Sequence, residues 1–479
     1  FVDAHGHFSD QASYLQYANL APQPAGSVRN IADLQDELRK LIETRKIPAG
    51  EWVVGAGYDP AYLAESRHPT KADLDAVSKD HRILIVHNSM HMGVVNSRVL
   101  AESGITADTP DPEGGIFGRV EGSREPNGVA KEQAFLPFIG ALPRASRPEQ
   151  IELIRQASVY YASKGFTTVQ DIILDPTSWE TLQAAAAEGA LLVDCGAYPF
   201  LTVMDPIMAA NGSKNEYRSG VKTIGIKVTL DGSVQGYTAF LEEPFFKMTE
   251  GQAADYRGFP SFPQDVVDSF AKKAYDQKWQ PLMHCNGDAA ADMMLDALEK
   301  AGFKAGDDRR PVMIHAQFVR EDQFDRMKAL GVMPSFFVSH VFYWGDYHRD
   351  VVLGAERASR ISATASAEKR GLRYTFHNDQ PVVPPSAIIL LWSAVTRTTR
   401  SGAVLGPDQK IPVIEALRAL TIDGAYQYFD ENRTGSLEAG KLADLVILSD
   451  NPLEIAPEAL KDLQVLETIK KGRTIYRAD

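Results

Sequence analysis

The sequence has very little cysteine. Only two of its 479 residues are cysteines, Cys195 and Cys285. Two thiols are too few for a disulfide framework or a zinc site with four cysteine ligands. The low count favours a reducing compartment such as the cytoplasm, although it is equally compatible with a periplasm. Because the chain begins with Phe1 and not with methionine, we expect residues upstream of it, where any signal peptide would lie.

The sequence also lacks a long apolar run and an excess of positive charge. No stretch approaches the roughly 18 uncharged apolar residues that span a bilayer, so we expect no membrane crossing. Lysine and arginine number 50 and aspartate and glutamate 63, which gives a net charge of −13. Such a surface repels phosphate backbones, so nucleic acid is not an expected partner. The 44% of apolar and 24% of charged residues exclude a disordered, collagen-like or coiled-coil chain.

From about residue 150 onward, helix-like and strand-like segments alternate. Together with a strand already in progress at the N-terminus, strand-like segments begin near residues 1, 166, 191, 223, 281, 311, 332 and 373. Eight alternating units predict an α/β fold with a parallel (β/α)8 barrel, or TIM barrel. An open doubly wound sheet is the alternative, but it does not explain why polar residues end most of these strands.

Two regions depart from this alternation. Residues 20–150 contain a helical stretch at 30–46 and a strand-like run at 82–87, followed by a turn-rich segment. We interpret them as a long insertion after the first strand, at the face where barrel active sites lie. The tail after residue 430 contains two strand-like runs, 441–448 and 466–476. The predicted organisation is a barrel over residues 1–430 and a small β subdomain over 431–479.

Several polar residues interrupt or end the apolar strands. His5 and His7 are two residues apart, so in a strand both imidazoles lie on one face, although an isolated His-x-His pair is a weak signal. An unpaired charge or imidazole inside an apolar run is costly. Their shared position at strand ends predicts convergence at the mouth of the barrel, where catalysis is built. The set comprises His5, His7, Lys227, His284, His315 and Asp379.

Lys227 has two interpretations that the residues alone do not separate. An ammonium group beside two cations is repelled and loses its proton. The neutral amine can then add carbon dioxide, which gives a carbamate whose two oxygens bridge a pair of metals. Alternatively, Lys227 forms an ion pair with Asp231, at the end of the same strand.

Seven segments in this order resemble the amidohydrolase superfamily, in particular its branch of N-substituted formamide deformylases and exoenzyme regulators. They are FVDAHGH (1–7), VVNSRVL (94–100), GIKVTLDGS (225–233), HCNGDAA (284–290), HAQ (315–317), NDQPV (378–382) and GSLEAGKLADLVIL (435–448). The resemblance covers nearly the whole chain. It also implies a small β-sandwich subdomain, whose N-terminal half is absent from this chain.

The resemblance implies a binuclear metal centre, with zinc as the expected ion. His5, His7 and Asp379 would bind one metal, and His284 and His315 the other. A carboxylated Lys227 would bridge the two, although some members of the family hold a single metal. One departure from the family pattern is His377, where many relatives carry a small residue; this side chain would shape the pocket or contact a metal ligand.

The expected activity is hydrolysis of an amide- or formamide-type carbon–nitrogen bond, other than a peptide bond, by a metal-activated hydroxide. Asp379 would accept the proton of the attacking hydroxide and pass it to the leaving nitrogen. The same metals would equally serve a deaminase or a hydrolase of cyclic amides. A further alternative is a non-catalytic regulatory or binding protein.

The expected partner is a small-molecule substrate, and a homo-oligomer is the usual state of such barrels. For Tyr343 and Trp344, ordinary loop packing is as good an interpretation as substrate contact. Gln170 could reach the mouth of the pocket, but a place in the core or at the surface is the favoured interpretation. The candidate substrate contacts are Tyr58, His91, His340, Tyr343 and Trp344.

Overall fold

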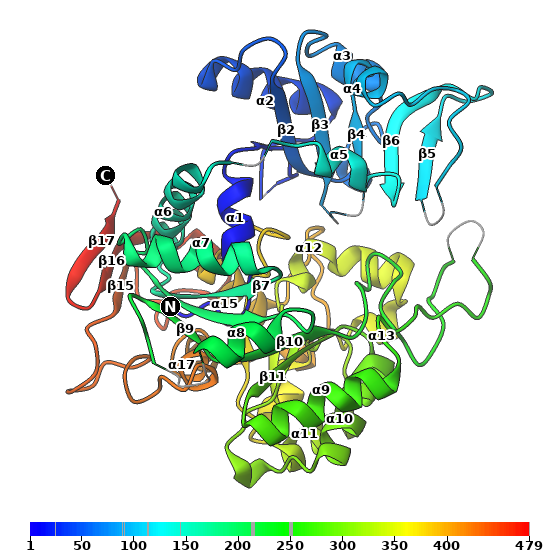
Figure 1. Cartoon of the computed structure of the whole chain (residues 1–479). Coiled ribbons are helices and arrows are strands. Elements are labelled where there is room, and N and C mark those ends of the chain that lie inside the picture. Colours follow the sequence, from blue (N-terminus) through cyan, green and yellow to red (C-terminus); the bar gives the residue numbers. More distant parts are fainter. Residues whose placement is uncertain are drawn as a thin grey trace. The chain divides into compact units, whose positions relative to one another are not determined.

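The computed structural model of the chain describes residues 1–23, 25–88, 90, 92–112, 115–143, 145–211, 216–248 and 252–478. It contains two compact units, each continuous in space but not in sequence (Figure 1). The first unit consists of residues 1–9, 154–380 and 385–479. The second unit consists of residues 10–153 and 381–384.

The first unit has an α/β fold, as predicted, with its central strands all parallel. Two groups of strands make up these parallel ladders. One group contains β7 (Thr168–Ile173), β8 (Asp194–Pro199) and β9 (Val221–Thr223). The other contains β10 (Gly225–Thr229), β11 (Gln280–Cys285), β12 (Val312–His315), β13 (Met333–Phe336) and β14 (Thr375–Phe376).

Single parallel bridges extend these ladders. Val2 pairs with Thr168, so the N-terminal segment runs beside β7. Phe200, directly after β8, pairs with Lys227 in β10 and links the two groups. Strands or bridges therefore occur at each of the eight places where the sequence predicts them, because apolar and β-branched residues between turn signals favour extended, buried backbone.

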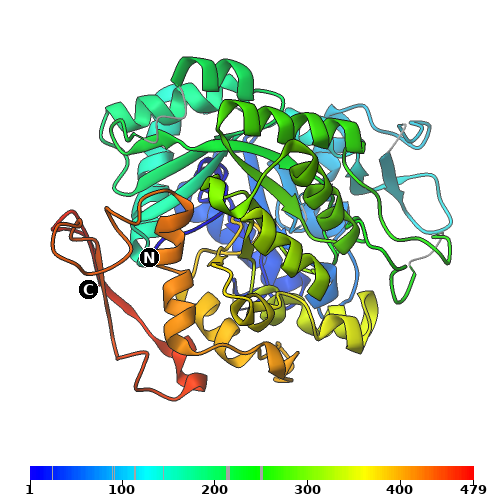
Figure 2. The same cartoon turned by 90° about the horizontal axis from the view of Figure 1, so that it is seen from below.

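Helices separate most of the strands of the first unit. In Figures 1 and 2, α9, α10 and α11 lie next to one another; α9 contacts β10 and β11, and α10 contacts β11. The helices from residue 147 to 301 are α6 (Arg147–Ser163), α7 (Pro176–Ala187), α8 (Met204–Asn211), α9 (Gln264–Gln277) and α10 (Asp288–Ala301). Those that follow are α11 (Glu321–Leu330), α12 (His340–Tyr347), α13 (Ala355–Ala358), α14 (Thr364–Lys369), α15 (Ala387–Thr396), α16 (Val413–Ala419) and α17 (Ile422–Gln427).

Among the residues that the structure describes, no helix combines the length and the apolar character needed to cross a lipid bilayer.

The C-terminal tail forms three antiparallel strands, so the prediction of two strands was wrong. They are β15 (Leu445–Leu448), β16 (Val465–Lys470) and β17 (Arg473–Arg477). The run predicted as one strand is divided by a two-residue turn in which Lys471 has φ +50° and Gly472 has φ +76°. Two successive positive φ angles are the requirement of the type I′ turn that joins adjacent strands of a hairpin.

The second unit is built on a mixed sheet of six strands in the order β1-β2-β3-β4-β6-β5. The sequence predicts only the helix α2 (Ile31–Arg45) and the strand β3 (Arg82–His87) of this unit. The other strands are β1 (Ala18–Asn19), β2 (Trp52–Tyr58), β4 (Met92–Val95), β5 (Gly115–Arg119) and β6 (Pro126–Glu132). The other helices are α3 (Lys71–Asp75), α4 (Ser97–Glu102), α5 (Leu136–Gly140) and α1 (Phe8–Tyr14), which begins in the first unit.

Arg397, directly after α15, is a fully buried cation that holds loops of the first unit together. Its guanidinium donates to the carbonyl oxygens of Leu405 (2.7 Å), Ser362 (3.0 Å) and Ile361 (2.7 Å). We expect Arg397→Met to lower the free energy of unfolding by about 3–5 kcal/mol, because three buried carbonyls lose a charged donor. Urea unfolding measures this loss. The exposed Arg418→Met is the control, with an expected change within about 0.5 kcal/mol; an equal loss in both variants would contradict the prediction.

Candidate metal centre

His5, His7 and Asp379 come together where the N-terminal segment meets the loop after β14. His5 Nε2 lies 3.2 Å and His7 Nε2 3.7 Å from Asp379 Oδ1. The backbone holds them in this register, since Asp379 N–H donates to His5 O (3.4 Å) and His7 N–H to Gln380 O (3.0 Å). One ligand atom of each of the three side chains lies within 4.8 Å of the others. A single metal ion can therefore contact all three.

The tautomer of His5 is fixed by Gln170, a fully buried residue of β7. The Gln170 amide nitrogen donates to Ala4 O (2.8 Å), which turns Oε1 toward His5 Nδ1 at 2.6 Å. His5 Nδ1 must therefore carry the proton, and a neutral His5 presents the lone pair of Nε2 to the carboxylate of Asp379. Burial lowers the pKa of His5 to about 4, so the ring is neutral at pH 7. Two hydrogen-bond acceptors thus face each other, an arrangement that a cation stabilises.

His284 and His315 form a second pair of facing nitrogens. His284 is the penultimate residue of β11 and His315 the last residue of the neighbouring strand β12, and His284 Nδ1 lies 3.0 Å from His315 Nε2. His315 Nε2 is also 4.0 Å from Asp379 Oδ2, so this pair adjoins the first group. Burial lowers the pKa of His284 to about 3 and that of His315 well below its ordinary value. Neutral imidazoles supply the lone pairs that a divalent metal requires.

Lys227 of β10 points into the same cluster. Its side chain is buried, and Nζ lies 3.5 Å from His5 Nε2. Burial lowers the pKa of Lys227 to about 8, although Asp379 opposes the shift. Within the described ranges Lys227 has no ion pair with Asp231, one of the two interpretations of the sequence. The carboxylate of Asp231 instead accepts hydrogen bonds from three backbone amides, those of Phe240, Asn286 and Gly287.

Two of these side chains stand on unusual backbone. His315 has φ +70° and Asp379 has φ +54°, in the left-handed region that residues other than glycine rarely adopt. Each such conformation costs about 1–3 kcal/mol and persists only where the surrounding structure holds it. In these conformations His315 Nε2 and Asp379 Oδ2 lie 4.0 Å apart.

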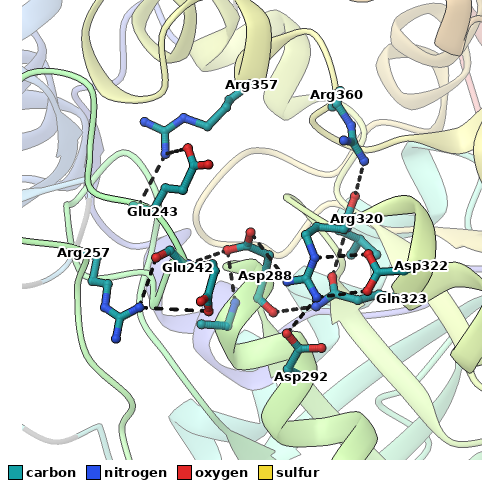
Figure 3. A network of polar contacts seen from close by, with 12 residues as sticks. Glu242, Glu243, Arg257, Asp288, Asp292, Arg320, Asp322, Gln323, Arg357 and Arg360 are labelled. Carbon is teal, nitrogen blue, oxygen red and sulfur yellow. Dashed lines mark hydrogen bonds and ion pairs between the residues drawn. The ribbon is translucent and has the colours of Figure 1, made fainter.

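A polar network connects the loops that follow β10, β11 and β12 (Figure 3). The N–H of Glu242, in the loop after β10, donates to Asp288 Oδ1 at the start of α10 (2.8 Å). Gln323 of α11 donates to Asp288 O (2.7 Å), and Arg320 donates to Asp292 (2.9 Å). These contacts fix the carboxyl ends of the strands that carry Lys227, His284 and His315 relative to one another.

Three of the five predicted substrate contacts lie on α12 and are buried. The ring of His340 is 6.5 Å from that of His315 and 5.3 Å from that of Trp344. His340 Nδ1 has no hydrogen-bond partner in the described part of the chain. Tyr343 packs instead against Trp344, with ring centroids 5.6 Å apart, and has the guanidinium of Arg400 at 5.6 Å over its ring. The structure therefore brings His340 and Trp344 nearest to the imidazole cluster.

The other two predicted contacts belong to the second unit. Tyr58 ends β2, is fully buried, and its hydroxyl lies 3.1 Å from Nδ1 of His68. His91 falls outside the described residues. Both remain predictions from the sequence.

Several residues outside the proposed ligand set contact these ligands. Gln170, expected in the core or at the surface, is buried and also contacts His5. Asn286 Nδ2 lies 3.0 Å from His284 Nε2. His377, predicted to shape the pocket or touch a ligand, has Nε2 3.1 Å from His315 Nδ1 and Nδ1 2.9 Å from Ser335 Oγ. Polar residues inside the apolar strands β7 and β13 were the only available signal for Gln170 and Ser335.

The chain is similar to known proteins over almost its whole length. The model of the Amidohydrolase family matches residues 1–476. N-substituted formamide deformylase from Arthrobacter pascens is 27% identical over 99% of this chain and 87% of its own length. A metal-dependent hydrolase from Pyrococcus horikoshii OT3, described as uncharacterized, superposes with a TM-score of 0.75 at 23% identity, over 95% of this chain and 86% of the other. A second such hydrolase, from Pyrococcus furiosus, has a TM-score of 0.72 at 24% identity and covers 95% and 87%.

The likeness to the two solved structures shows a shared fold, and the family match extends over almost every residue. The resemblance drawn from the seven sequence segments is thereby confirmed. This chain belongs to the Amidohydrolase family.

Proposed function

We propose that the chain is a metal-dependent hydrolase that cleaves the carbon–nitrogen bond of a small amide- or formamide-type substrate. The observation that carries the proposal is the 3.2 Å approach of His5 Nε2 to Asp379 Oδ1, two acceptors held face to face by Gln170. A divalent cation bound between the two atoms would remove the repulsion between their lone pairs. Membership of the family supports hydrolysis, and the likeness to the deformylase of Arthrobacter pascens supports the substrate class.

We propose two zinc ions, because the donor set is rich in imidazole. His5, His7 and Asp379 would hold one ion, and His284 and His315 the other. Lys227 would bridge them as a carbamate: its neutral nitrogen bonds to the carbon of carbon dioxide and releases one proton. The 3.5 Å between Nζ and His5 Nε2 supports this role, because the extra carboxylate would reach the same space.

In the proposed mechanism, a bound metal lowers the pKa of water toward 7 and polarises the substrate carbonyl. Asp379 would take the proton of the attacking water and return it to the leaving nitrogen, which departs as an amine. The backbone N–H of Asp379, bonded to His5 O, holds the carboxylate in place for both transfers. His340 Nδ1, which has no partner among the described residues, would bind a polar group of the substrate, with Trp344 beside it.

We propose that the parallel strands close into the (β/α)8 barrel that the sequence predicts. The parallel pairs run without a break from the N-terminal segment to β14. His7 N–H donates to Gln380 O and thus connects the loop after β14 with the N-terminal segment. The second unit would be the domain inserted after the first strand, and residues 431–479 part of a small β subdomain.

Metal removal tests the proposed function directly. Protein loaded with zinc and bicarbonate is expected to contain about two ions per chain by elemental analysis. Dialysis against a chelator should remove both ions and all hydrolytic activity, and zinc should restore them together, because no other group in the site lowers the pKa of water.

The substrate class is tested with a panel of formamides, linear amides, cyclic amides and amine-bearing heterocycles. Turnover of formamides or linear amides by the zinc-loaded protein is the expected result. Turnover of only cyclic amides or heterocycles would replace the proposed substrate class. A fully loaded protein that hydrolyses none of them would contradict the function and favour a binding protein.

A further inference from the structure

We infer that His377 and Ser335 are positioning residues that hold His315 in the form that binds a metal. The inference rests on the proposed metal centre and concerns a part of it that contacts no substrate. His377 directly follows β14, and Ser335 lies in the adjacent strand β13, paired with Thr375. Both side chains are fully buried. They extend the line of polar contacts from His315 in β12 across two further strands.

The distances define one continuous chain of hydrogen bonds. Ser335 Oγ lies 2.9 Å from His377 Nδ1, and His377 Nε2 lies 3.1 Å from His315 Nδ1. The other ring nitrogen of His315, Nε2, lies 3.0 Å from His284 Nδ1, at the place where the proposed metal would bind. Both nitrogens of His377 are thus engaged, so His377 acts on His315 and is not itself a metal ligand.

Metal binding leaves only one arrangement of the protons in this chain. A metal on Nε2 of a neutral His315 requires the proton on Nδ1, which then donates to His377 Nε2. A neutral His377 that accepts at Nε2 carries its own proton on Nδ1, and that proton is donated to Ser335 Oγ. The hydroxyl of serine can accept in this way. Ser335 therefore supplies the acceptor that this arrangement needs, and through His377 it stabilises the tautomer of His315 whose lone pair faces the metal.

Packing against three neighbouring rings holds the side chain of His377 in one orientation. The centroid of its ring lies 5.2 Å from that of His5, 5.0 Å from that of His315 and 5.5 Å from that of Phe337. The backbone N–H of His377 donates to Phe336 O (3.2 Å), which fixes the base of the side chain. A ring held on three sides can transmit the choice of tautomer, whereas a mobile ring would not.

Without Ser335 a proton on His377 Nδ1 has no acceptor, so the metal-free protein favours the reverse arrangement. His377 would then carry its proton on Nε2 and donate to His315 Nδ1, which leaves a proton on His315 Nε2, where the metal would bind. Zinc must displace that proton and reverse both tautomers. The cost therefore falls on metal binding and not on the stability of the metal-free fold.

The test compares four variants by competition for zinc with a chromophoric chelator, and by thermal unfolding of the metal-free proteins. Ser335→Ala and His377→Phe are expected to bind one of the zinc ions about 10–100-fold more weakly than the wild type. His377→Gln keeps an acceptor amide oxygen near His315 Nδ1 and should recover most of the affinity. The matched control is Ser393→Ala, because Ser393 is a fully buried serine whose hydroxyl has no hydrogen-bond partner in the described part of the chain.

Unchanged zinc affinity in Ser335→Ala would overturn the inference, as would an equal loss in Ser393→Ala. A loss in His377→Gln as large as that in His377→Phe would also overturn it, since the effect would then follow ring packing. If the wild type binds both zinc ions and all four variants bind them equally well, the inference is wrong and the proposed function still stands. Wild-type protein that binds no zinc removes both.

Discussion

Replacing Asp379 by asparagine is expected to lower kcat by about 100- to 10,000-fold, because the amide cannot carry the proton from the attacking water to the leaving nitrogen. Asparagine has the same shape and tolerates the φ of +54° at this position better than most residues do. The fold and the contact of the backbone N–H with His5 O should therefore persist. The measurement is kcat with a formamide or amide substrate on zinc-loaded protein, together with its metal content.

The matched control for this prediction is Asp423→Asn. Asp423 is a partly buried carboxylate of α17 that pairs with Arg373 at 2.8 Å and lies outside the proposed ligand set. Its loss should leave kcat within a few fold of the wild type. Normal kcat in Asp379→Asn at full metal content would exclude the proposed proton transfer. A loss of metal in that variant, in proportion to the loss of activity, would assign Asp379 to metal binding alone.

The second large effect is expected at Lys227. Lys227→Met keeps an unbranched side chain that is one atom shorter and removes the nitrogen that would form the carbamate. The variant should retain only about one of two zinc ions and lose about 100- to 1,000-fold in kcat, because a group that stabilises charge in the transition state is gone. Burial lowers the pKa of the wild-type amine to about 8, so this amine reaches the neutral form that reacts with carbon dioxide more readily than an ordinary lysine does.

The control for Lys227 uses the supply of carbon dioxide. Wild-type protein loaded with zinc in buffer free of carbon dioxide should bind fewer ions than protein loaded with bicarbonate, whereas Lys227→Met should not respond. Mass spectrometry of the intact wild-type chain should detect the added carbon dioxide. Two ions in Lys227→Met, or no bicarbonate effect in the wild type, would contradict the carbamate and leave a hydrolase without a bridging ligand.

The strands of the first unit were predictable because their signal is local. Each strand is a short apolar or β-branched run between turn residues. This pattern is visible in the sequence whichever strand it pairs with. The division of the C-terminal run at Lys471 and Gly472 was not foreseen, because lysine gives no sign of a positive φ. The six-stranded sheet of the second unit also escaped prediction: β1 has only two residues, and β5 and β6 carry polar and glycine residues that weaken the apolar pattern.

Candidate ligands were predictable because polar residues at the ends of buried strands are conspicuous. His284 and His315 each end an apolar run, and the structure brings their ring nitrogens to 3.0 Å. The substrate contacts were harder to predict from the sequence. His340, Tyr343 and Trp344 share one short helix. The sequence could not show that Nδ1 of His340 has no hydrogen-bond partner among the described residues, whereas Tyr343 packs against Trp344.

The sequence by itself determined the α/β class, the family and the six candidate ligands, since all of these follow from residue types in order along the chain. Only the tertiary structure decided which atom of each side chain faces which. Gln170 lies 165 positions from His5. Ser335 and His315 lie in two different strands and are connected through His377, which follows a third strand. Hydrogen bonds of this kind depend on strand register and ring orientation. These are set by packing between distant segments, which no local pattern encodes.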